Sequence, residues 1–171
     1  RAFSQHKPEW GVLVSRIVKN DISTGIVICP VQDIYTAVHN NELITSSFDY
    51  EQIEITNKQD NVISCESNLE LLDNFKNDNF LFRNRNQFCK DIISIGFSTF
   101  DAVITSAPFA HDRLAYEPIA KYIGGTVSAI DGKQIPIFEE DVVTLICKSP
   151  EVKEVVISKL KSYDNLQEAA S

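Results

Sequence analysis

Hydrophobic and polar positions alternate along the first third of the chain. Residues 10–19, WGVLVSRIVK, change character with a period of two, and shorter segments repeat the pattern at 26–30, 33–38, 43–47 and 50–56. A period of two is typical of strands that bury one face. The intervening turns are rich in Asn, Asp and Gly, which favours consecutive hairpins. Residues 1–57 are therefore predicted to form an antiparallel meander with one covered and one partly solvated face.

From residue 58 onward the pattern changes, and strands are predicted to alternate with helices. Short apolar runs indicate strands at 61–65, 79–83, 101–105, 126–130 and 142–147. Apolar residues recur at helical spacing in 66–77, 87–100, 112–123 and 149–163. This order predicts an α/β (α+β) fold in which helices cover a sheet, with residues 1–57 and 58–171 as its two subdomains.

Two of these helices carry recognisable end signals. Gly124 and Gly125 follow the third helix, where glycine can adopt a left-handed cap without steric cost. Ser149 is expected to cap the last helix, with Pro150 in its first turn.

Composition narrows the class of protein. The 171 residues have 43% hydrophobic content and a formal net charge of −8, which fits a globular domain and argues against a nucleic-acid polymer or an anionic membrane as partner. No apolar stretch is long enough to span a bilayer. Four widely separated cysteines without a CxxC pair indicate buried free thiols in a reducing compartment, so the expected location is cytoplasmic.

No motif for covalent catalysis or nucleotide binding is present, and carboxylates are the remaining candidates for chemistry. Asp101 begins a predicted strand, and Asp112 follows at the predicted start of a helix. This position lies in the crevice beyond the carboxyl end of a strand, where α/β proteins bind ligands. Asp112 could cap the helix, or its hard oxygen atoms could hold Mg²⁺. Spacing alone favours the cap.

The order of several motifs resembles the C-terminal part of the inositol monophosphatase family. Asp101, a gap of ten residues and Asp112 are followed by the pairs Gly124-Gly125 and Asp131-Gly132, as in that family. Upstream, GIVICPVQDIYTAV is similar to the family's GVVYDPxxxExYxA hairpin. The opening RAF and WG are similar to the segment after the DPIDGT signature in the histidinol-phosphatase-like branch. The resemblance is collinear over nearly the whole chain.

This resemblance implies the second half of an inositol-monophosphatase-like layered sandwich and a Mg²⁺-dependent phosphomonoesterase. Asp112 matches the family's last metal-ligand Asp, and the helix start would favour negative charge nearby. The expected substrate is a small phosphate monoester: inositol phosphate, histidinol phosphate or a nucleotide 3′-phosphate.

Four further residues are candidates for substrate binding. Thr105 stands where the family often has a Glu that contacts substrate hydroxyls, and His111 stands where it usually has Trp or Tyr. Arg83 could meet a phosphate in bidentate fashion, and Phe88 follows it in the next segment of the chain. The alternatives remain open, because Arg83 could equally be solvated and His111 could be a packing residue.

The resemblance also places several metal ligands outside these 171 residues. The chain begins with Arg1, just where the DPIDGT signature would end, so a missing N-terminal half is expected to supply the family's other carboxylates. One carboxylate cannot hold a catalytic Mg²⁺, and the chain alone is expected to be inactive. The family resemblance further implies a homodimer. A non-catalytic relative that binds a ligand or a partner is the alternative, and an unrelated α/β domain is a third possibility.

Overall fold

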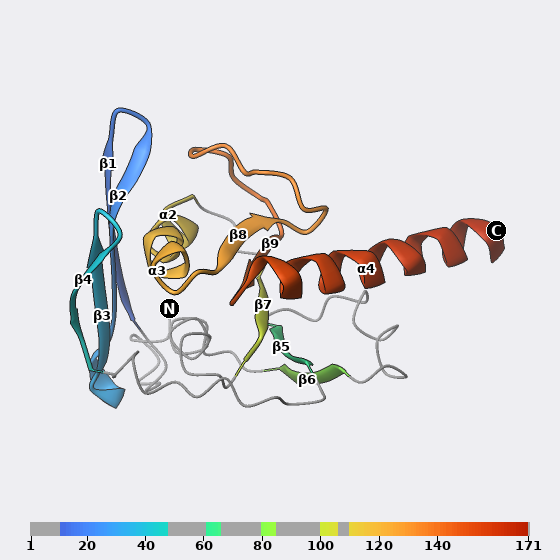
Figure 1. Ribbon diagram of the computed structural model, residues 1–171, viewed down its shortest axis with the longest axis horizontal. Helices are drawn as coiled ribbons and strands as arrows, with labels where there is room; N and C mark the ends of the chain where they lie inside the picture. Colours follow the sequence, from blue (N-terminus) through green and yellow to red (C-terminus); the bar gives the residue numbers. More distant parts are fainter. Residues whose placement is uncertain (1–10, 48–60, 66–79, 85–99, 106–109, 171) are drawn as a thin grey trace.

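The computed structural model describes residues 11–47, 61–65, 80–84, 100–105 and 110–170 (Figure 1). The four strands nearest the N-terminus form one antiparallel sheet, called sheet A, in the order β1-β2-β3-β4. They are β1 (Val12–Val18), β2 (Asp21–Cys29), β3 (Ile34–His39) and β4 (Glu42–Ser46), with a short 3-10 helix, η2 (Pro30–Gln32), between β2 and β3. The meander predicted for this part of the chain is confirmed over 12–46, whereas the predicted strand at 50–56 lies outside the described residues.

Two tight turns set the register of sheet A. Val18 pairs with Asp21, and His39 pairs with Glu42, so each turn has only two residues. Lys19 and Asn20 have φ of 51° and 64°, and Asn40 and Asn41 have φ of 48° and 63°. Positive φ at both central positions is the type I′ geometry, whose twist matches that of the flanking strands.

Sheet B contains five strands in the order β6-β5-β7-β9-β8. They are β5 (Asn61–Cys65), β6 (Phe80–Asn84), β7 (Ala102–Thr105), β8 (Thr126–Ala129) and β9 (Thr144–Cys147). β5 runs parallel to β6 and β7, while β9 is antiparallel to both β7 and β8. All five predicted strands of this part are confirmed, and they form a mixed sheet. The predicted helices at 66–77 and 87–100 lie outside the described residues.

The helix predicted over 112–123 differs from the structure at its start and in its middle. It begins at Ala110 and is divided at Ala115 into α2 (Ala110–Leu114) and α3 (Tyr116–Tyr122). Pro118 has no amide hydrogen, so the carbonyl of Leu114 loses the hydrogen bond that would continue the helix. In α3 itself, Pro118 occupies the first turn, where a missing amide hydrogen is tolerated.

Both predicted helix-end signals are confirmed. The Gly124 amide donates to the Lys121 carbonyl at 3.1 Å and the Gly125 amide to the Ala120 carbonyl at 2.7 Å, with φ of 79° at Gly124. This is the Schellman pattern, which favours glycine at the left-handed position. In α4 (Pro150–Ala170), the Ser149 hydroxyl accepts a hydrogen bond from the Val152 amide at 3.3 Å, as an N-cap does.

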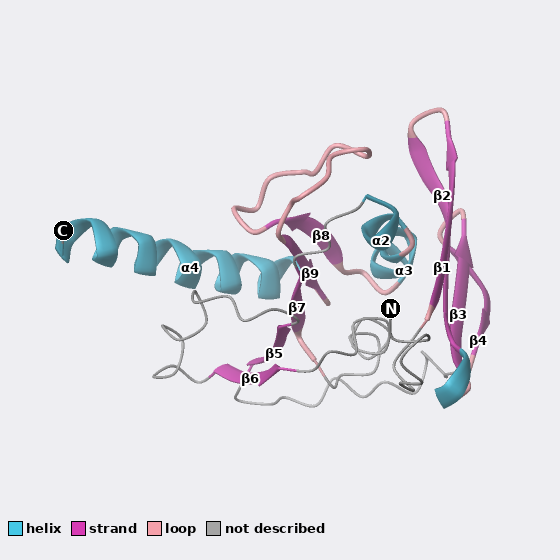
Figure 2. Ribbon diagram, turned by 180° about the vertical axis from the view of Figure 1, so that it is seen from behind, coloured by secondary structure: helices cyan, strands magenta, loops and turns pink. Residues whose placement is uncertain are grey.

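Sheets and helices alternate through the molecule (Figures 1 and 2): sheet A, then α2 and α3, then sheet B, then α4. One core joins sheet A, α3 and sheet B, and its buried members include Val27, Val38, Tyr116, Val103 and Ile146. A second core lies between the other face of sheet B and α4, and it includes Ile104, Leu145, Val156 and Leu160. The mixed layered fold predicted from the sequence is therefore present.

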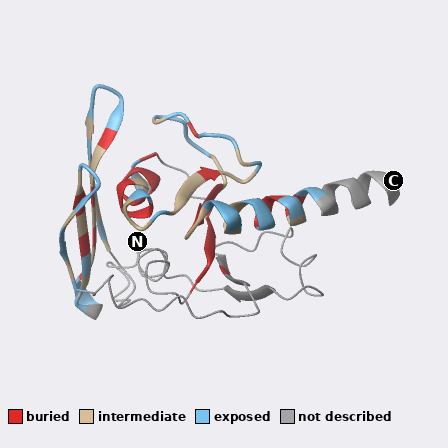
Figure 3. Ribbon diagram, viewed as in Figure 1, coloured by how far each residue is buried: buried red, intermediate tan, exposed pale blue. Residues whose placement is uncertain are grey.

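Burial differs between the two sheets (Figure 3). Every residue of β7 and β9 is buried, whereas β1 alternates between exposed and partly buried positions. The predicted subdomain boundary near residue 57 lies outside the described residues. Sheets A and B nevertheless share the core around Tyr116, so they pack as one body.

Two further sequence-based expectations bear on the described residues. None of the helices in the described part of the chain is long and apolar enough to cross a membrane. Cys29 and Cys147 are buried cysteines, as predicted. Burial raises the pKa of the Cys147 thiol to about 12, which keeps it protonated and unreactive at neutral pH.

Candidate functional site

The candidate site lies where β7 ends and α2 begins. β7 ends at Thr105, and α2 starts at Ala110, so Asp112 is the third residue of that helix. An N-cap residue precedes the helix, and the capping role considered for Asp112 is therefore wrong. The side chain of Asp112 lies outside the described residues, so its role as a metal ligand stays a prediction.

Asp101 is held in a buried ion pair at the opposite end of β7. Its carboxylate pairs with the Lys148 ammonium, and its carbonyl accepts a hydrogen bond from the Lys148 amide at 3.0 Å. Asp101 is 6% exposed. Four residues of extended strand separate Asp101 from Thr105, which is about 13 Å. Asp101 therefore ties β7 to β9 and does not share a site with the start of α2.

A buried arginine next to Asp112 anchors α2. Arg113 is only 3% exposed, and it donates hydrogen bonds to the carbonyls of Pro136 and Ile137 at 3.0 Å and of Glu139 at 3.2 Å. Burial lowers the pKa of Arg113, and the nearby carboxylates of Glu117 and Glu139 oppose that shift. The guanidinium thus binds the loop between β8 and β9 to α2. Sequence reasoning missed this residue, because its partners are backbone carbonyls more than twenty positions away.

Sheet A supports the same helix from the other side. A Cβ atom at Gly25 of β2 would lie 2.1 Å from the Ala115 carbonyl oxygen, so only glycine allows this close approach. Ala110 and Leu114 of α2 form a small buried cluster with Ile22 of β2. The backbone that carries Asp112 is therefore held by sheet A, by the 136–139 loop and by the α3 junction.

Three of the other predicted site residues lie in the described part of the chain, each on a different element. Thr105 has no exposed surface, and its backbone pairs with Thr144. His111 is exposed on α2. Arg83 lies on the edge strand β6 at the level of Ser64, which also pairs with Val103 of β7. Phe88 and the side chain of Arg83 lie outside the described residues.

The topology places Arg83, Thr105 and the helix that carries His111 at the same end of sheet B, where the parallel strands have their carboxyl ends. β6, β5 and β7 are parallel, so Arg83 and Thr105 both lie near the carboxyl ends of their strands, and α2 follows that edge. Two strand spacings separate the backbones of β6 and β7, about 10 Å. A small ligand could span this distance, but none of these residues is tested as a ligand contact, and their roles stay predictions.

The described residues do not by themselves fit a resident metal ion. Within the described ranges, no group of three or more His, Cys, Asp or Glu side chains is arranged to hold one. Asp112 and any other carboxylate ligands would have to come from side chains or segments outside that part.

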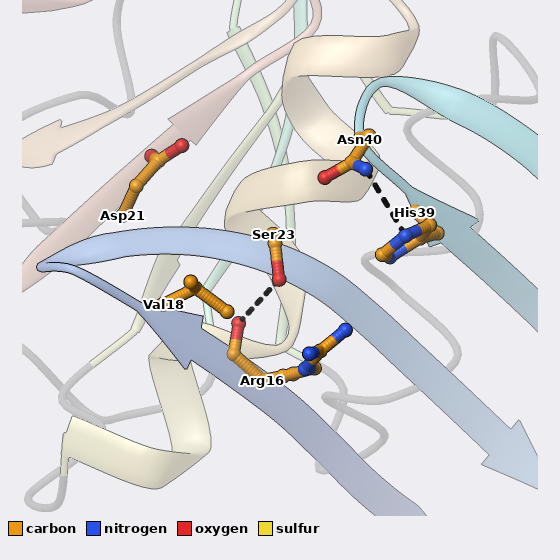
Figure 4. Close-up of a pocket in the computed structure, with 6 residues that line it drawn as sticks. All are labelled: Arg16, Val18, Asp21, Ser23, His39 and Asn40. Atoms are coloured by element: carbon orange, nitrogen blue, oxygen red, sulfur yellow. Dashed lines mark hydrogen bonds between the residues drawn. The ribbon is translucent and has the colours of Figure 1, made fainter.

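A cavity of about 290 Å³ lies elsewhere, on sheet A (Figure 4). It is lined by residues at the hairpin ends of β1, β2 and β3: Arg16, Val18, Asp21, Ser23, His39 and Asn40. None of the predicted site residues takes part. The sequence offered a signal for a polar surface here, because polar residues replace apolar ones towards these turns.

Comparison with known proteins shows the fold but no close relative. No protein-family profile and no curated protein matches the sequence. Among solved structures, an inositol monophosphatase from Zymomonas mobilis is similar with a TM-score of 0.74 and 16% identity over 94% of this chain and 66% of that one. An IMPase/NADP phosphatase complexed with Mg²⁺ and phosphate has a TM-score of 0.75 and 15% identity over 92% of this chain and 61% of that one.

A third structure, SaIMPase-II bound to 2′-AMP, has a TM-score of 0.77 and 15% identity over 99% of this chain. The present chain spans 68% of that protein, so it corresponds to between 61% and 68% of the three neighbours. At this level of identity the likeness shows the fold: the chain folds like inositol monophosphatases over nearly its whole length.

Proposed function

We propose that the intact protein hydrolyses a small phosphate monoester with the help of Mg²⁺, and that Asp112 is one ligand of the metal. The observation that carries this proposal is the placement of α2 directly beyond the carboxyl end of β7, in a fold shared with inositol monophosphatases. One structure of that fold is described as holding Mg²⁺ and phosphate.

The chain's own residues would position the ester. Arg113 and Gly25 hold α2 in place, so the residue at 112 is presented from a fixed backbone. Arg83 would bind phosphate oxygens from β6, at the same end of sheet B. Phe88, Thr105 and His111 would line the pocket. Mg²⁺ would supply charge stabilisation of the phosphoryl group and activation of a water molecule.

The remaining ligands would come from polypeptide outside these residues. One carboxylate is too few for a hard cation, and the structural neighbours are longer than this chain. The 171-residue chain alone is therefore proposed to be inactive. Inositol phosphate, histidinol phosphate and a nucleotide 3′-phosphate are the candidate substrates, and a homodimer in the cytoplasm is the proposed state.

The test is Mg²⁺-dependent phosphate release from this panel, measured on a protein that contains the whole fold. Asp112→Asn is expected to lower the rate by about 100-fold or more, because a metal ligand is lost. Asp131→Asn is the matched control, since Asp131 is an exposed carboxylate paired with Lys133, and it should retain the rate. Equal rates for Asp112→Asn and wild type would remove Asp112 from the mechanism.

One observation favours a second candidate, a non-catalytic relative of the family. Thr105 occupies the position where the resemblance places a substrate-contacting Glu, and it is completely buried. A non-catalytic protein would bind phosphate esters in equilibrium dialysis without releasing phosphate at any Mg²⁺ concentration.

A further inference from the structure

The cavity on sheet A is not used by the proposed phosphatase site. Its six lining residues, here called the hairpin cavity, are Arg16, Val18, Asp21, Ser23, His39 and Asn40 (Figure 4). The volume of about 290 Å³ lies at the lower end of the range for small-molecule sites, which is roughly 300–1,000 Å³. The hairpin cavity therefore has room for a ligand of few heavy atoms.

A β-bulge lies in the wall of the hairpin cavity. Arg16 pairs with Thr24 and Ile17 pairs with Ile22, so Ser23 has no partner residue in β1. The Ser23 hydroxyl instead donates a hydrogen bond to the Arg16 carbonyl at 3.2 Å. A bulge bends its strand and changes the direction of neighbouring side chains. Residues on both sides of the bulge thus line one cavity.

Another part of the wall is a hydrogen-bonded imidazole. Asn40 Nδ2 lies 3.1 Å from His39 Nε2, and Thr24 Oγ1 lies 2.8 Å from His39 Nδ1. The amide nitrogen of Asn40 donates, so Nε2 accepts and Nδ1 donates its hydrogen to the Thr24 hydroxyl. Both ring nitrogens therefore have partners within the wall, and the charged groups of the cavity are Arg16 and Asp21.

These two opposite charges do not neutralise each other. Arg16 and Asp21 are both exposed, and no ion pair among the described residues involves either side chain. Figure 4 shows them extending on opposite sides of Ser23. A simple anion would be repelled by Asp21, and a simple cation would be repelled by Arg16. The complementary ligand carries one charge of each sign.

We propose that the hairpin cavity binds a small zwitterion, a molecule with a carboxylate and an ammonium group as in a free amino acid. Arg16 would donate two parallel N–H hydrogen bonds to the carboxylate, and Asp21 would accept hydrogen bonds from the ammonium group. Val18 is 40% exposed and would contact an aliphatic side chain. This site lies on sheet A, apart from the end of sheet B that carries the phosphatase proposal, so either proposal can fail without the other.

Three matched ligands test this proposal. L-valine carries both charges, isovalerate lacks its ammonium group, and isobutylamine lacks its carboxylate. Each is titrated at neutral pH into the isotope-labelled 171-residue chain, and binding is measured from the NMR shifts of the amides of residues 16–24 and 39–40. L-valine is expected to bind about fivefold tighter or more than either analogue, because its second charge binds intramolecularly once the first is bound.

Variants assign each charge to its residue. Arg16→Gln should abolish the advantage of L-valine over isobutylamine, and Asp21→Asn should abolish its advantage over isovalerate. Asp131→Asn is the matched control, since Asp131 is an exposed carboxylate paired with Lys133, and it should leave all three affinities unchanged. Arg16 and Asp21 are exposed, so these substitutions should leave the fold intact. The dispersion of the amide spectrum confirms that each variant is folded.

Four results would overturn the proposal. The first is equal affinity of the wild-type chain for L-valine and isovalerate, which would assign the cavity to simple anions. The second is tightest binding of isobutylamine, which non-specific attraction to a chain of net charge −8 would produce. The third is the absence of ligand-dependent shifts at the hairpin cavity. The fourth is an equal loss of L-valine affinity in Asp21→Asn and Asp131→Asn.

Discussion

Sheets A and B both lie against α3, but they bury their residues differently. β7 and β9 of sheet B are buried at every position, because helices cover both faces. β1 of sheet A is exposed at alternate residues, because only its inner face meets α3. The pattern of apolar residues along a strand therefore indicates whether one or both of its faces are covered.

The difference in burial also determines how strongly a substitution in each sheet is expected to affect stability. Sheet B depends on dense packing on both sides, where a lost methyl group leaves a cavity. Sheet A packs only its inner face on the shared core, and it makes one close contact with the α2/α3 junction at Gly25. Three predictions test this contrast, in order of decreasing effect.

The largest effect is expected in the core of sheet B. Ile104→Ala should lower the free energy of unfolding by about 2–5 kcal/mol, because Ile104 is fully buried between sheet B and α4. Ile44→Ala in sheet A is the matched control, and it should change stability by less than about 0.5 kcal/mol, since Ile44 is 62% exposed. Urea denaturation measures both, and equal losses would contradict the contrast.

An intermediate effect is expected where sheet A meets the helices. Gly25→Ala should cost about 1–3 kcal/mol, because its new Cβ would overlap the Ala115 carbonyl and push α2 and α3 outward. Gly124→Ala has open space around it but a φ of 79°, and the strain should cost only about 1 kcal/mol. Thermal unfolding of both variants measures which substitution costs more stability. A larger loss for Gly124→Ala would show that the contact between Gly25 and Ala115 can relax at little cost.

The smallest effect is a dependence on pH that belongs to sheet B. The pKa of Cys147 is raised by burial from 9.0 to about 12, so the folded thiol keeps its proton where the unfolded thiol loses it. Stability from this thiol is complete below about pH 9 and is lost as pH rises towards 12, by at most about 1.4 kcal/mol per pH unit.

Cys147→Ala removes this term. Between about pH 8 and pH 9.5, its free energy of unfolding should fall less steeply than that of wild type, by less than about 1 kcal/mol in total. The difference between the two urea titrations cancels all groups that both proteins share. Parallel curves would show that the thiol reaches solvent in the native state.

The sequence predicted the features that depend on local chemistry. Asn40 and Asn41 in a two-residue turn, Gly124 after a helix and Ser149 before one each act within a few residues, so their outcomes follow from residue type. The turn expected between residues 19 and 26 is wrong in extent, because β2 already begins at Asp21. The strands could also be predicted, because runs of β-branched residues between turns favour strands over helices. The resemblance gave the layered fold that solved structures share.

Features set by distant contacts were not predicted. The break at Ala115 had a visible cause in Pro118, but the apolar spacing over 112–123 suggested one continuous helix. The burial of Arg113 depends on carbonyls in the 136–139 loop, and the strand order of sheet B depends on long-range pairing. At the candidate site, the sequence identified Asp112 by resemblance, and only its backbone position is now established.

The last helix has a practical consequence. α4 contacts sheet B through Val156, Ile157 and Leu160, and its C-terminal half continues past the sheet in both views (Figures 1 and 2). A dye or an affinity tag attached at the end of this helix would sit clear of both cores and of the hairpins of sheet A. The C-terminus is therefore the natural position at which to immobilise the protein for surface-based binding measurements.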